Sequence, residues 1–550
     1  MEYNIKNLQK QIRLTETENE SLTVFISGTD GLSRARVIAC HKTSPDALDD
    51  IVREFCEKET VKHLRVDVVM NKQKMSFPDA QKIISETKRN NYFRSGIAFD
   101  DNFMVSLLSE ELQGNAILKP VAEHVVGLNS PGLHIDRKNL ERYISGKYSK
   151  MISLNPERHD ITLFETQGFF LENGEWLTLS TGNTDQGLRL VRENELCNVM
   201  TDVITGGTRF LLKEMGADGK FTYGYWPCYN KVIPGYNSVR HFSSIYALLE
   251  SGQFLKDDTI TDRAKAAIEW GLQNMGLRAG RALYIAERNR SGVSVKLGAQ
   301  AMALLTISKY QEVSGSHHFL DTIYDLIAGI KEKFIDAAGN TVHILDENLE
   351  VKRAFEIVYY DGEAVFGILR SYLLTNDNSQ LLLAKMLFDR LIAKGYEKYH
   401  DHWLSYATNE ILLHLEEKEY YEFGLKNAFG NLNFIRKRDT AYPTMLELLM
   451  AAIKMVHRLQ NSKFQAVIPL PEDDVKRLVE VAHERALHEI KTGVFWPELA
   501  IFMKHPDRIV NSFYARHDRF RIRIDDQEHF LSGLINYVNW FHHSHDPVNY

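Results

Sequence analysis

The feature that most constrains this chain is a series of helix-length segments from about residue 193 onward that alternate between two kinds. Some carry many charges, as solvated helices do; they begin near residues 259, 317, 379 and 472. Others are apolar or small nearly all round, which is typical of buried helices; they begin near residues 238, 295, 361, 403, 441 and 526. This alternation predicts a closed ring of helical hairpins with six helices inside and six outside, and the alternative is an open α-solenoid or an irregular helical domain.

Helical periodicity places about twelve helices in this region. We expect them at residues 193–215, 238–252, 259–275, 295–313, 317–335, 361–375, 379–395, 403–416, 418–429, 441–460, 472–491 and 526–543. The aromatic stretch between residues 216 and 237 predicts a hairpin or loop. The fold class is therefore mainly α: an (α/α)6 toroid over residues 193–550.

The first part of the chain has a different pattern. Residues 1–150 mix strand-like alternation, as in 63–70, with helical spacing, as in 46–57, which predicts a small α+β domain. Residues 151–192 read as a β-hairpin turning at Asn173-Gly174, a favoured hairpin dipeptide. We expect this stretch to be a connector packed on one of its neighbours.

Composition excludes several classes of protein. The net charge of −7 and pI near 6.3 argue against a dedicated nucleic-acid binder. No run of eighteen apolar residues predicts a membrane span, and no apolar stretch at the start predicts a secretory signal, so we expect a cytoplasmic protein. The four cysteines have no zinc spacing, and no phosphate-binding glycine motif occurs, so we expect neither a metal nor a cofactor.

A polar, aromatic segment precedes each proposed inner helix. In a ring of parallel inner helices all six segments open on one face and form a crater, and helix N-termini favour polar or anionic ligands there. Aromatic faces stack on sugar rings, and the basic residues favour an anionic sugar or glycan. The expected substrate-binding residues are Tyr236, Asn237, Arg240, Lys296, Tyr359, Tyr360, His402, Trp403, Arg438, Arg516, Arg519 and His529.

Glycoside hydrolysis needs two carboxyl groups, one protonated and one ionised. Asp361 or Glu363 could form such a pair across the crater with Asp526 or Glu528, although helix capping is the alternative role for these acids.

His241 could instead act as the general base of an epimerase or lyase, or it could be a hydrogen-bonded core histidine. The His400-x-His402 pair lacks a clear third ligand and is a weak metal signal.

Over residues 193–543 this pattern resembles the (α/α)6-toroid superfamily of carbohydrate-active proteins, in its helix count, alternation and polar helix starts. That superfamily includes N-acylglucosamine 2-epimerase-like proteins and unsaturated glucuronyl hydrolases. The epimerase-like group implies a pair of catalytic histidines on inner helices, for which His241 and His529 occupy plausible places. The hydrolase group implies an inner-helix aspartate, for which Asp361 is the best candidate. No catalytic motif of either group matches residue by residue.

The sequence therefore favours a carbohydrate-active enzyme, either a glycoside hydrolase or a sugar epimerase. One alternative is a non-catalytic, glycan-binding or scaffold subunit of a polysaccharide biosynthesis pathway. The other is an α-toroid cyclase, because Ile524-Asp525-Asp526 weakly resembles the aspartate-rich motif of the terpenoid cyclases.

Overall fold

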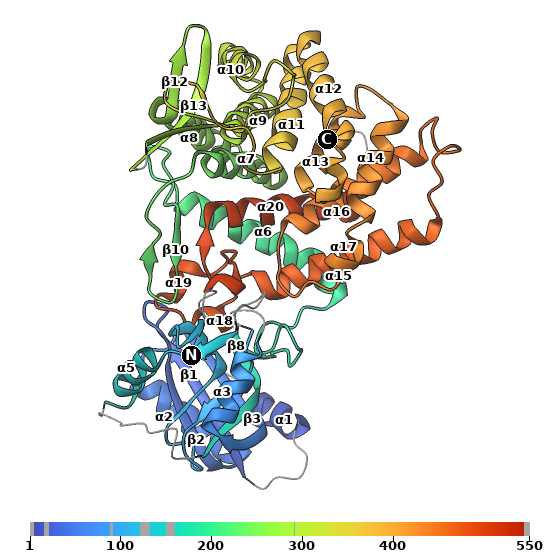
Figure 1. Cartoon of the computed structure of the whole chain (residues 1–550). Coiled ribbons are helices and arrows are strands. Elements are labelled where there is room, and N and C mark those ends of the chain that lie inside the picture. Colours follow the sequence, from blue (N-terminus) through green and yellow to red (C-terminus); the bar gives the residue numbers. More distant parts are fainter. Residues whose placement is uncertain are drawn as a thin grey trace.

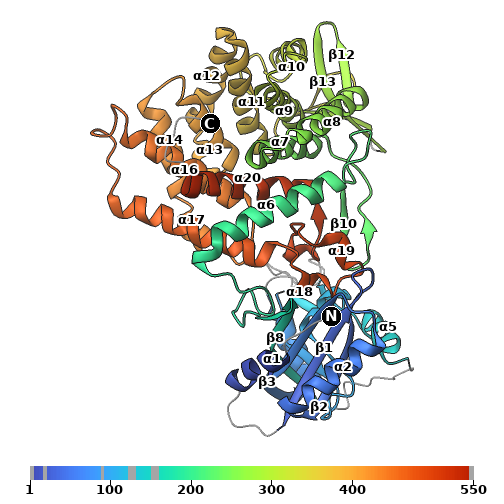
Figure 2. The same ribbon diagram turned by 180° about the vertical axis from the view of Figure 1, so that it is seen from behind.

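The structure is a computed structural model that describes residues 5–15, 21–87, 92–121, 132–149, 160–290 and 292–543. A larger helical domain lies above a smaller domain built on a β-sheet, as Figures 1 and 2 show from opposite sides. The outermost parts of the expected domains, 1–4 and 544–550, and the boundary at 150–159, lie outside the described residues.

All twelve expected helices of the toroid form, with ends within about five residues of those predicted. The outer helices are α6 (Leu196–Lys213), α8 (Thr259–Met275), α10 (Leu320–Lys333), α12 (Asn378–Ala393), α14 (Lys418–Phe429) and α17 (Glu472–Gly493). The inner helices are α7 (Ser238–Leu255), α9 (Leu297–Ser314), α11 (Tyr359–Thr375), α13 (His402–Ile411), α16 (Thr444–Gln460) and α20 (Ile524–Val538).

The ring of inner helices is closed. Each inner helix packs against the next one along the chain, and α20 packs back against α7. The inner position explains the lack of a polar face, since α9 is buried at every residue from Leu297 to Gln311. Close approach depends on small residues: a Cβ at Gly362 of α11 would lie 2.8 Å from the backbone nitrogen of Leu404 in α13. The predicted (α/α)6 toroid is therefore confirmed, and the open solenoid is excluded.

Short strands lead into two of the inner helices. One sheet has the order β11-β10-β17 and the other the order β12-β13-β14-β15-β16. Their bounds are β10 (Gly224–Trp226), β11 (Lys231–Val232), β12 (Gly276–Ala279), β13 (Ala282–Asn289), β14 (Gly292–Lys296), β15 (Ile344–Leu345), β16 (Val351–Arg353) and β17 (Ile522–Arg523). The expected aromatic hairpin is the pair β10–β11, while β14 and β17 run directly into α9 and α20.

The N-terminal domain is the expected α+β unit, with one sheet in the order β2-β1-β3-β8-β4-β5 and β9 paired to β8. The strands are β1 (Leu22–Thr29), β2 (Arg36–Thr43), β3 (His63–Ser76), β4 (Gly96–Ala98), β5 (Ser106–Leu107), β8 (Asp160–Glu172) and β9 (Glu175–Thr178), and β6 (Leu118–Pro120) pairs separately with β7 (Leu133–Ile135). The helices are α1 (Ile5–Thr15), α2 (Leu48–Lys58), α3 (Phe77–Ser85), α4 (Ser109–Gly114) and α5 (Arg137–Tyr148).

The stretch expected to be a connector belongs to this sheet instead. The hairpin turns at Asn173-Gly174 as predicted, but its first strand, β8, lies between β3 and β4. At thirteen residues β8 is long enough to pair with both neighbours, and it is buried along most of its length. The hairpin signal is local, whereas the place of β8 in the sheet depends on its pairing with β3 and β4, which lie far from it in the sequence.

The two domains meet through a buried, mixed interface. Ile501 and Phe502, which follow α18 (Pro497–Ala500), pack among Phe25, Phe103 and Phe164 of the N-terminal sheet. The remaining short helices of the toroid domain are α15 (Leu432–Arg436) and α19 (Pro506–Ile509). Among the described residues, none of the helices has both the length and the apolar character needed to cross a membrane.

Candidate active site

The starts of the inner helices contact one another in a circuit. Arg240 of α7 pairs with Asp525 of α20, with Nε 2.7 Å from Oδ2. His529 of α20 bonds Glu447 of α16 through Nδ1 and Oε2, which are 2.9 Å apart. The same Glu447 oxygen lies 3.9 Å from Nε2 of His402 on α13. Three neighbouring pairs of helices thus bring polar side chains to one end of the ring.

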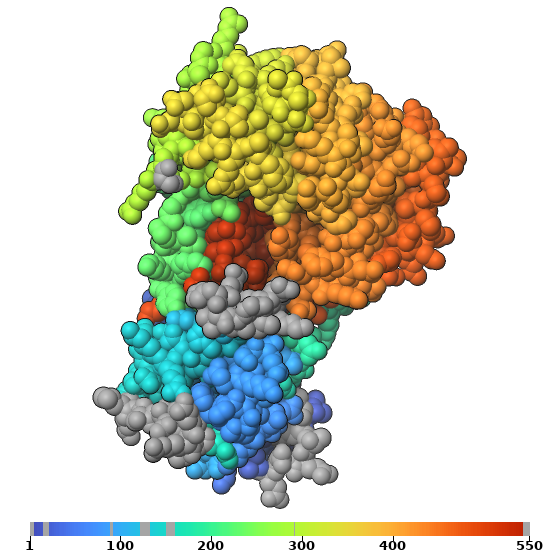
Figure 3. Space-filling model, in the orientation of Figure 1, coloured from blue at the N-terminus to red at the C-terminus, as the bar shows by residue number. Residues whose placement is uncertain are grey.

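The circuit continues on the other side. The ring of Tyr359, at the start of α11, lies 5.5 Å from the ring of His402. Its neighbour Tyr360 lies against Gly298 of α9, where a Cβ would stand 2.3 Å from the tyrosine ring. All six starts therefore surround one basin. In the space-filling view of Figure 3 a hollow lies between the toroid and the N-terminal domain, and its floor is red, the colour of the last part of the chain.

A pair of histidines, His402 and His529, lies among these helix starts. The rings of His402 and His529 have their centroids 5.2 Å apart and are nearly perpendicular, at 78°. Glu447 contacts both rings and also accepts a hydrogen bond from the hydroxyl of Tyr406 at 3.2 Å. Because Nδ1 of His529 is engaged by Glu447, its Nε2 is the nitrogen left for a ligand. The Nε2 of His402 is buried and has no hydrogen-bond partner among the described residues.

The backbone that carries His402 is fixed by an outer helix. Asn427 of α14 accepts a hydrogen bond from the backbone nitrogen of Asp401 at 3.0 Å and donates one to the Asp401 carbonyl at 2.8 Å. Asp401 in turn caps α13 by accepting from the backbone nitrogen of Leu404. Its other carboxylate oxygen lies 3.0 Å from Nδ1 of His402. This reciprocal amide pair holds the first turn of α13 and so the position of the imidazole.

Buried carboxyl groups around the histidines hold protons more tightly than usual. Burial raises the pKa of Glu447 to about 8, against the opposing charge of His402. Burial also raises the pKa of Glu528, whose Oε2 lies 3.2 Å from Nδ1 of His529. For Glu363, burial and the charges of nearby aspartates raise the pKa well above the ordinary value. Burial thus favours the protonated form of three carboxyl groups that lie close to the two imidazoles.

The same three central side chains have the donor types of a metal site. Nitrogen atoms of His402 and His529 and a carboxylate oxygen of Glu447 lie within 4.8 Å of one another. Two histidines and a glutamate are the ligand set of some catalytic zinc sites. His400, the other half of the His-x-His motif, is directed elsewhere, with Nδ1 2.7 Å from the carbonyl of Asn427. A metal here would therefore use residues far apart in sequence, which a local motif does not indicate.

The basic residues of the basin are already neutralised. The charge of Asp525 is shared by Arg240 and by Arg523, whose Nη2 lies 2.8 Å away. Although burial opposes ionisation of Asp525, these two guanidinium groups hold its pKa below the ordinary value. Lys296 forms an ion pair with Glu287 at 3.0 Å. Because Arg240 and Lys296 have acidic partners, they give little preference for an anionic sugar.

Two of the four expected catalytic acids have structural partners. Asp361 is buried and accepts hydrogen bonds from Thr341 and from His343, with Nε2 3.2 Å from Oδ2. Asp526 accepts from the backbone nitrogen of Arg523 at 2.9 Å, so it has the capping role that was the alternative interpretation. Glu363 and Glu528 remain in the basin.

His241 lies outside the basin. It is fully buried, with Nε2 3.0 Å from the carbonyl of Ala267 in α8 and Nδ1 2.8 Å from the hydroxyl of Tyr236. The next residue along a helix points about 100° further round its axis, so Arg240 faces the basin and His241 faces the outer layer. The structure gives it the place of a core histidine, which was the alternative interpretation.

Several expected binding residues also have other partners. Asn237 caps α7 by accepting from the backbone nitrogen of Arg240. Arg438 donates to Thr440, and Arg519 lies over the ring of Trp226 at 4.4 Å. Arg516 donates to the carbonyl of Thr184 and lies over the ring of Tyr92, so it joins the toroid to the preceding part of the chain.

Trp403 follows His402 and is buried, with its ring 6.5 Å from that of His529. Of the twelve expected binding residues, the structure therefore brings together Arg240, Lys296, Tyr359, Tyr360, His402, Trp403 and His529.

Glu447, Asp401 and Asp525 belong to the basin but were not among the predicted catalytic or substrate-binding residues. Glu447 lies in the segment Met445-Leu-Glu-Leu-Leu-Met, whose apolar residues predict only a buried helix. An ionisable residue in a helix that is apolar all round is itself the available signal, because such a charge is rarely buried without a partner.

The fold and the basin define a closed (α/α)6 toroid with a histidine–carboxylate site where its inner helices begin. No family model matches the chain, and no curated protein sequence matches it. The chain is similar to the solved structure of cellobiose 2-epimerase from Bacillus thermoamylovorans B4167, with 11% identity, a TM-score of 0.45, and coverage of 62% of this chain and 100% of that one.

It is also similar to a D-mannose isomerase, with 9% identity, a TM-score of 0.47, and coverage of 62% of this chain and 98% of that one. The GH76A α-1,6-mannanase from Salegentibacter sp. HEL1_6 gives 11% identity, a TM-score of 0.44, and coverage of 61% and 98%. At 9 to 11% identity no residue role passes from these proteins to this chain.

Proposed function

We propose that this protein is a sugar epimerase or isomerase that moves a proton on the carbon next to a carbonyl group. The observation that supports it most is the pair His402 and His529, whose rings lie 5.2 Å apart with Glu447 in contact with both. Imidazole is the commonest general acid–base group in enzymes, and proton transfer at carbon requires such a group within reach of the substrate carbon.

The chemistry follows from the proton inventory of the basin. One histidine takes the proton from the carbon, and the electrons of that C–H bond move toward the carbonyl oxygen, giving an enediol. The oxygen takes its proton from an acid in the basin, and Glu447 is suited to this role because burial raises its pKa to about 8. Returning a proton to the opposite face of the same carbon, with loss of the added proton from the oxygen, gives an epimer. Returning it to the neighbouring carbon, with loss of the proton from the other enediol oxygen, gives an isomer. Because Glu447 contacts both rings, it can pass protons between them.

We infer that the substrate is a neutral sugar. Arg240 forms an ion pair with Asp525, and Lys296 forms one with Glu287. Both basic residues were predicted to bind an anion, and both already have an acidic partner. The aromatic rings of Tyr359 and Tyr360 at the start of α11 supply the faces on which a sugar ring stacks. Glycoside hydrolysis has less support, because burial raises the pKa of both Glu363 and Glu528, and a hydrolase needs one ionised carboxylate besides its acid. The carboxylate whose pKa is lowered, Asp525, is already paired with Arg240 and Arg523.

The test is solvent exchange at carbon. The full-length protein is incubated in D2O with a panel of neutral aldoses, ketoses and reducing disaccharides, and proton NMR follows the hydrogen on the carbon next to the carbonyl. We expect replacement of that hydrogen by deuterium together with appearance of the epimer or isomer. His402→Gln and His529→Gln should each slow the exchange by about 10²–10⁴-fold, the usual contribution of a general acid–base group.

His317→Gln is the matched control, since His317 is exposed on the outer layer and should leave the rate unchanged. Release of new reducing ends without deuterium incorporation would make the protein a hydrolase. Saturable glycan binding with neither exchange nor hydrolysis would support the non-catalytic alternative, and in either case the proposed proton transfer would be wrong.

A further inference from the structure

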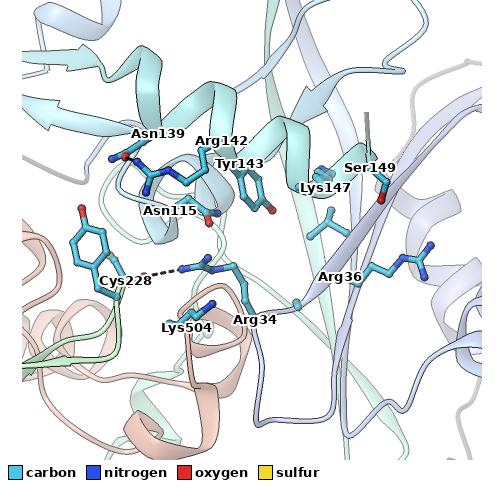
Figure 4. A pocket seen from close by; sticks show the side chains of 14 residues that line it. Arg34, Arg36, Asn115, Asn139, Arg142, Tyr143, Lys147, Ser149, Cys228 and Lys504 are labelled. Atoms are coloured by element: carbon cyan, nitrogen blue, oxygen red, sulfur yellow. Dashed lines mark hydrogen bonds between the residues drawn. The ribbon is translucent and has the colours of Figure 1, made fainter. Parts of the chain in front are cut away.

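A second cavity, of about 750 Å³, lies where the N-terminal domain meets the toroid domain. Its walls come from the start of β2, from α5, from the loop after β10 and from the segment after α18. Figure 4 shows Arg34 and Lys504 on one side of it, with Asn115, Tyr143 and Arg142 on the other. Cavities of this size hold small-molecule ligands in many proteins. None of its lining residues belongs to the histidine basin.

The lining is strongly and one-sidedly charged. Five basic residues line the cavity, and no aspartate or glutamate does. Two of the five form ion pairs with acidic residues that do not line the cavity: Lys147 with Glu111, at 2.7 Å, and Arg36 with Glu59. The other three, Arg34, Arg142 and Lys504, have no ion pair with any described residue.

Arg34 is the centre of this charge. Its guanidinium donates to three backbone carbonyls, those of Phe502 at 2.9 Å, Gly114 at 2.9 Å and Cys228 at 2.8 Å. Burial lowers the pKa of Arg34, and the opposing effects of Tyr143, Cys228 and Glu111 do not make up for the water that the cation has lost. A positive charge in such a place is stabilised when an anion binds beside it. The three carbonyls belong to both domains, so the group that attracts the anion also holds the domains together.

We propose that this cavity binds a small phosphorylated molecule. Three cations without an acidic partner among the described residues fit a ligand carrying two or more negative charges, and a phosphate ester carries about −1.5 to −2 at neutral pH. Arginine guanidinium groups match phosphate oxygens in geometry as well as charge. Tyr229, which is 47% exposed, adds an aromatic face for the rest of the ligand. The site is independent of the proposed sugar chemistry.

The test uses the full-length protein and inorganic pyrophosphate as the probe, with isothermal titration calorimetry. We expect one saturable site whose affinity falls as salt rises, because phosphate contacts of basic side chains are screened. Lys504→Gln and Arg142→Gln each change an exposed side chain, so folding should be preserved, and each should weaken binding about tenfold. Lys138→Gln is the matched control on the same helix, α5, where the side chain is exposed and outside the cavity; its affinity should equal that of the unmodified protein.

Two further measurements distinguish this cavity from the histidine basin and phosphate from other anions. His529→Gln should leave pyrophosphate binding unchanged, whereas loss of binding there would place the anion in the histidine basin and overturn the proposal. Citrate should bind more weakly than pyrophosphate, and the reverse order would overturn the assignment to phosphate. Absence of saturable binding, or equal binding by the Lys504→Gln/Arg142→Gln double variant, would remove the site altogether.

Discussion

Glu447 is the residue on which the electrostatics of the basin depend most. It is fully buried, and burial raises its pKa to about 8, while a glutamate in an unfolded chain has a pKa of about 4.3. Between these two values the folded protein binds more protons than the unfolded chain, so its stability falls as pH rises through that window. Glutamine keeps the neutral form at every pH.

We therefore expect the unmodified protein to lose Tm relative to Glu447→Gln as the pH is raised from 5 to 8. Thermal unfolding of both proteins at three pH values in this range measures the difference. Parallel curves would show that Glu447 titrates normally. The same substitution should lower the rate of carbon–hydrogen exchange, because an amide cannot supply the proton that the proposed chemistry requires.

The three central side chains also permit a direct test for metal dependence. If the reaction uses only His402, His529 and Glu447 as proton donors and acceptors, dialysis against EDTA should leave the exchange rate unchanged. Metal analysis of the protein before and after dialysis is the control. A loss of activity that returns on adding zinc or manganese would show instead that these residues are ligands, and the acid–base roles proposed for them would be wrong.

At the scale of the helices, one ion pair joins the first inner helix to the last. Arg240 of α7 and Asp525 of α20 are 31% and 11% exposed at the side chain, so the pair is only partly screened by water. Asp525→Asn should lower the stability by about 1–3 kcal/mol, because it leaves the guanidinium group of Arg240 without its carboxylate and removes the shorter of the two ion pairs of Arg523.

Chemical denaturation measures this cost. Asp389→Asn is the matched control, because Asp389 pairs with Lys385 on the solvated helix α12 and should change the stability by less than about 0.5 kcal/mol. If the two variants were equally stable, the Arg240–Asp525 pair would not contribute to closing the ring.

The elements of the toroid were predictable because their signals are local. A helix that is apolar on every face must be inside, and α9 and α16 could be assigned from composition alone. The hairpin that contains β8 was predicted, but its place inside the N-terminal sheet was not, because β8 pairs with β3 and β4, which lie far from it in the sequence. Side-chain direction was the main failure: His241 follows Arg240 directly but faces the opposite layer. The contacts between side chains on different helices also could not be predicted, because His529 and Glu447 are 82 residues apart in the sequence.

At the scale of the whole molecule, a fully buried arginine fixes the N-terminal domain to the toroid. Arg65 of β3 forms ion pairs with Asp67 at 2.7 Å and with Glu110 at 2.6 Å, all within the N-terminal domain. It also donates to the carbonyl of Glu498, in α18 of the toroid, at 2.9 Å. A single side chain thus forms ion pairs with two buried carboxyl groups and contacts the other domain, so the domains should unfold together.

Arg65→Met should destabilise the protein by about 3–5 kcal/mol, because removing one partner leaves buried charges uncompensated. Five of the six tryptophans lie in the toroid domain and only Trp176 in the N-terminal domain, so tryptophan fluorescence mainly follows the toroid. If the domains are coupled, this signal will shift to lower denaturant concentration although the substitution is in the other domain. Arg53→Met, on the exposed face of α2, should leave the transition in place. A toroid transition that stays unchanged in Arg65→Met would mean that the ring folds independently of the sheet beneath it.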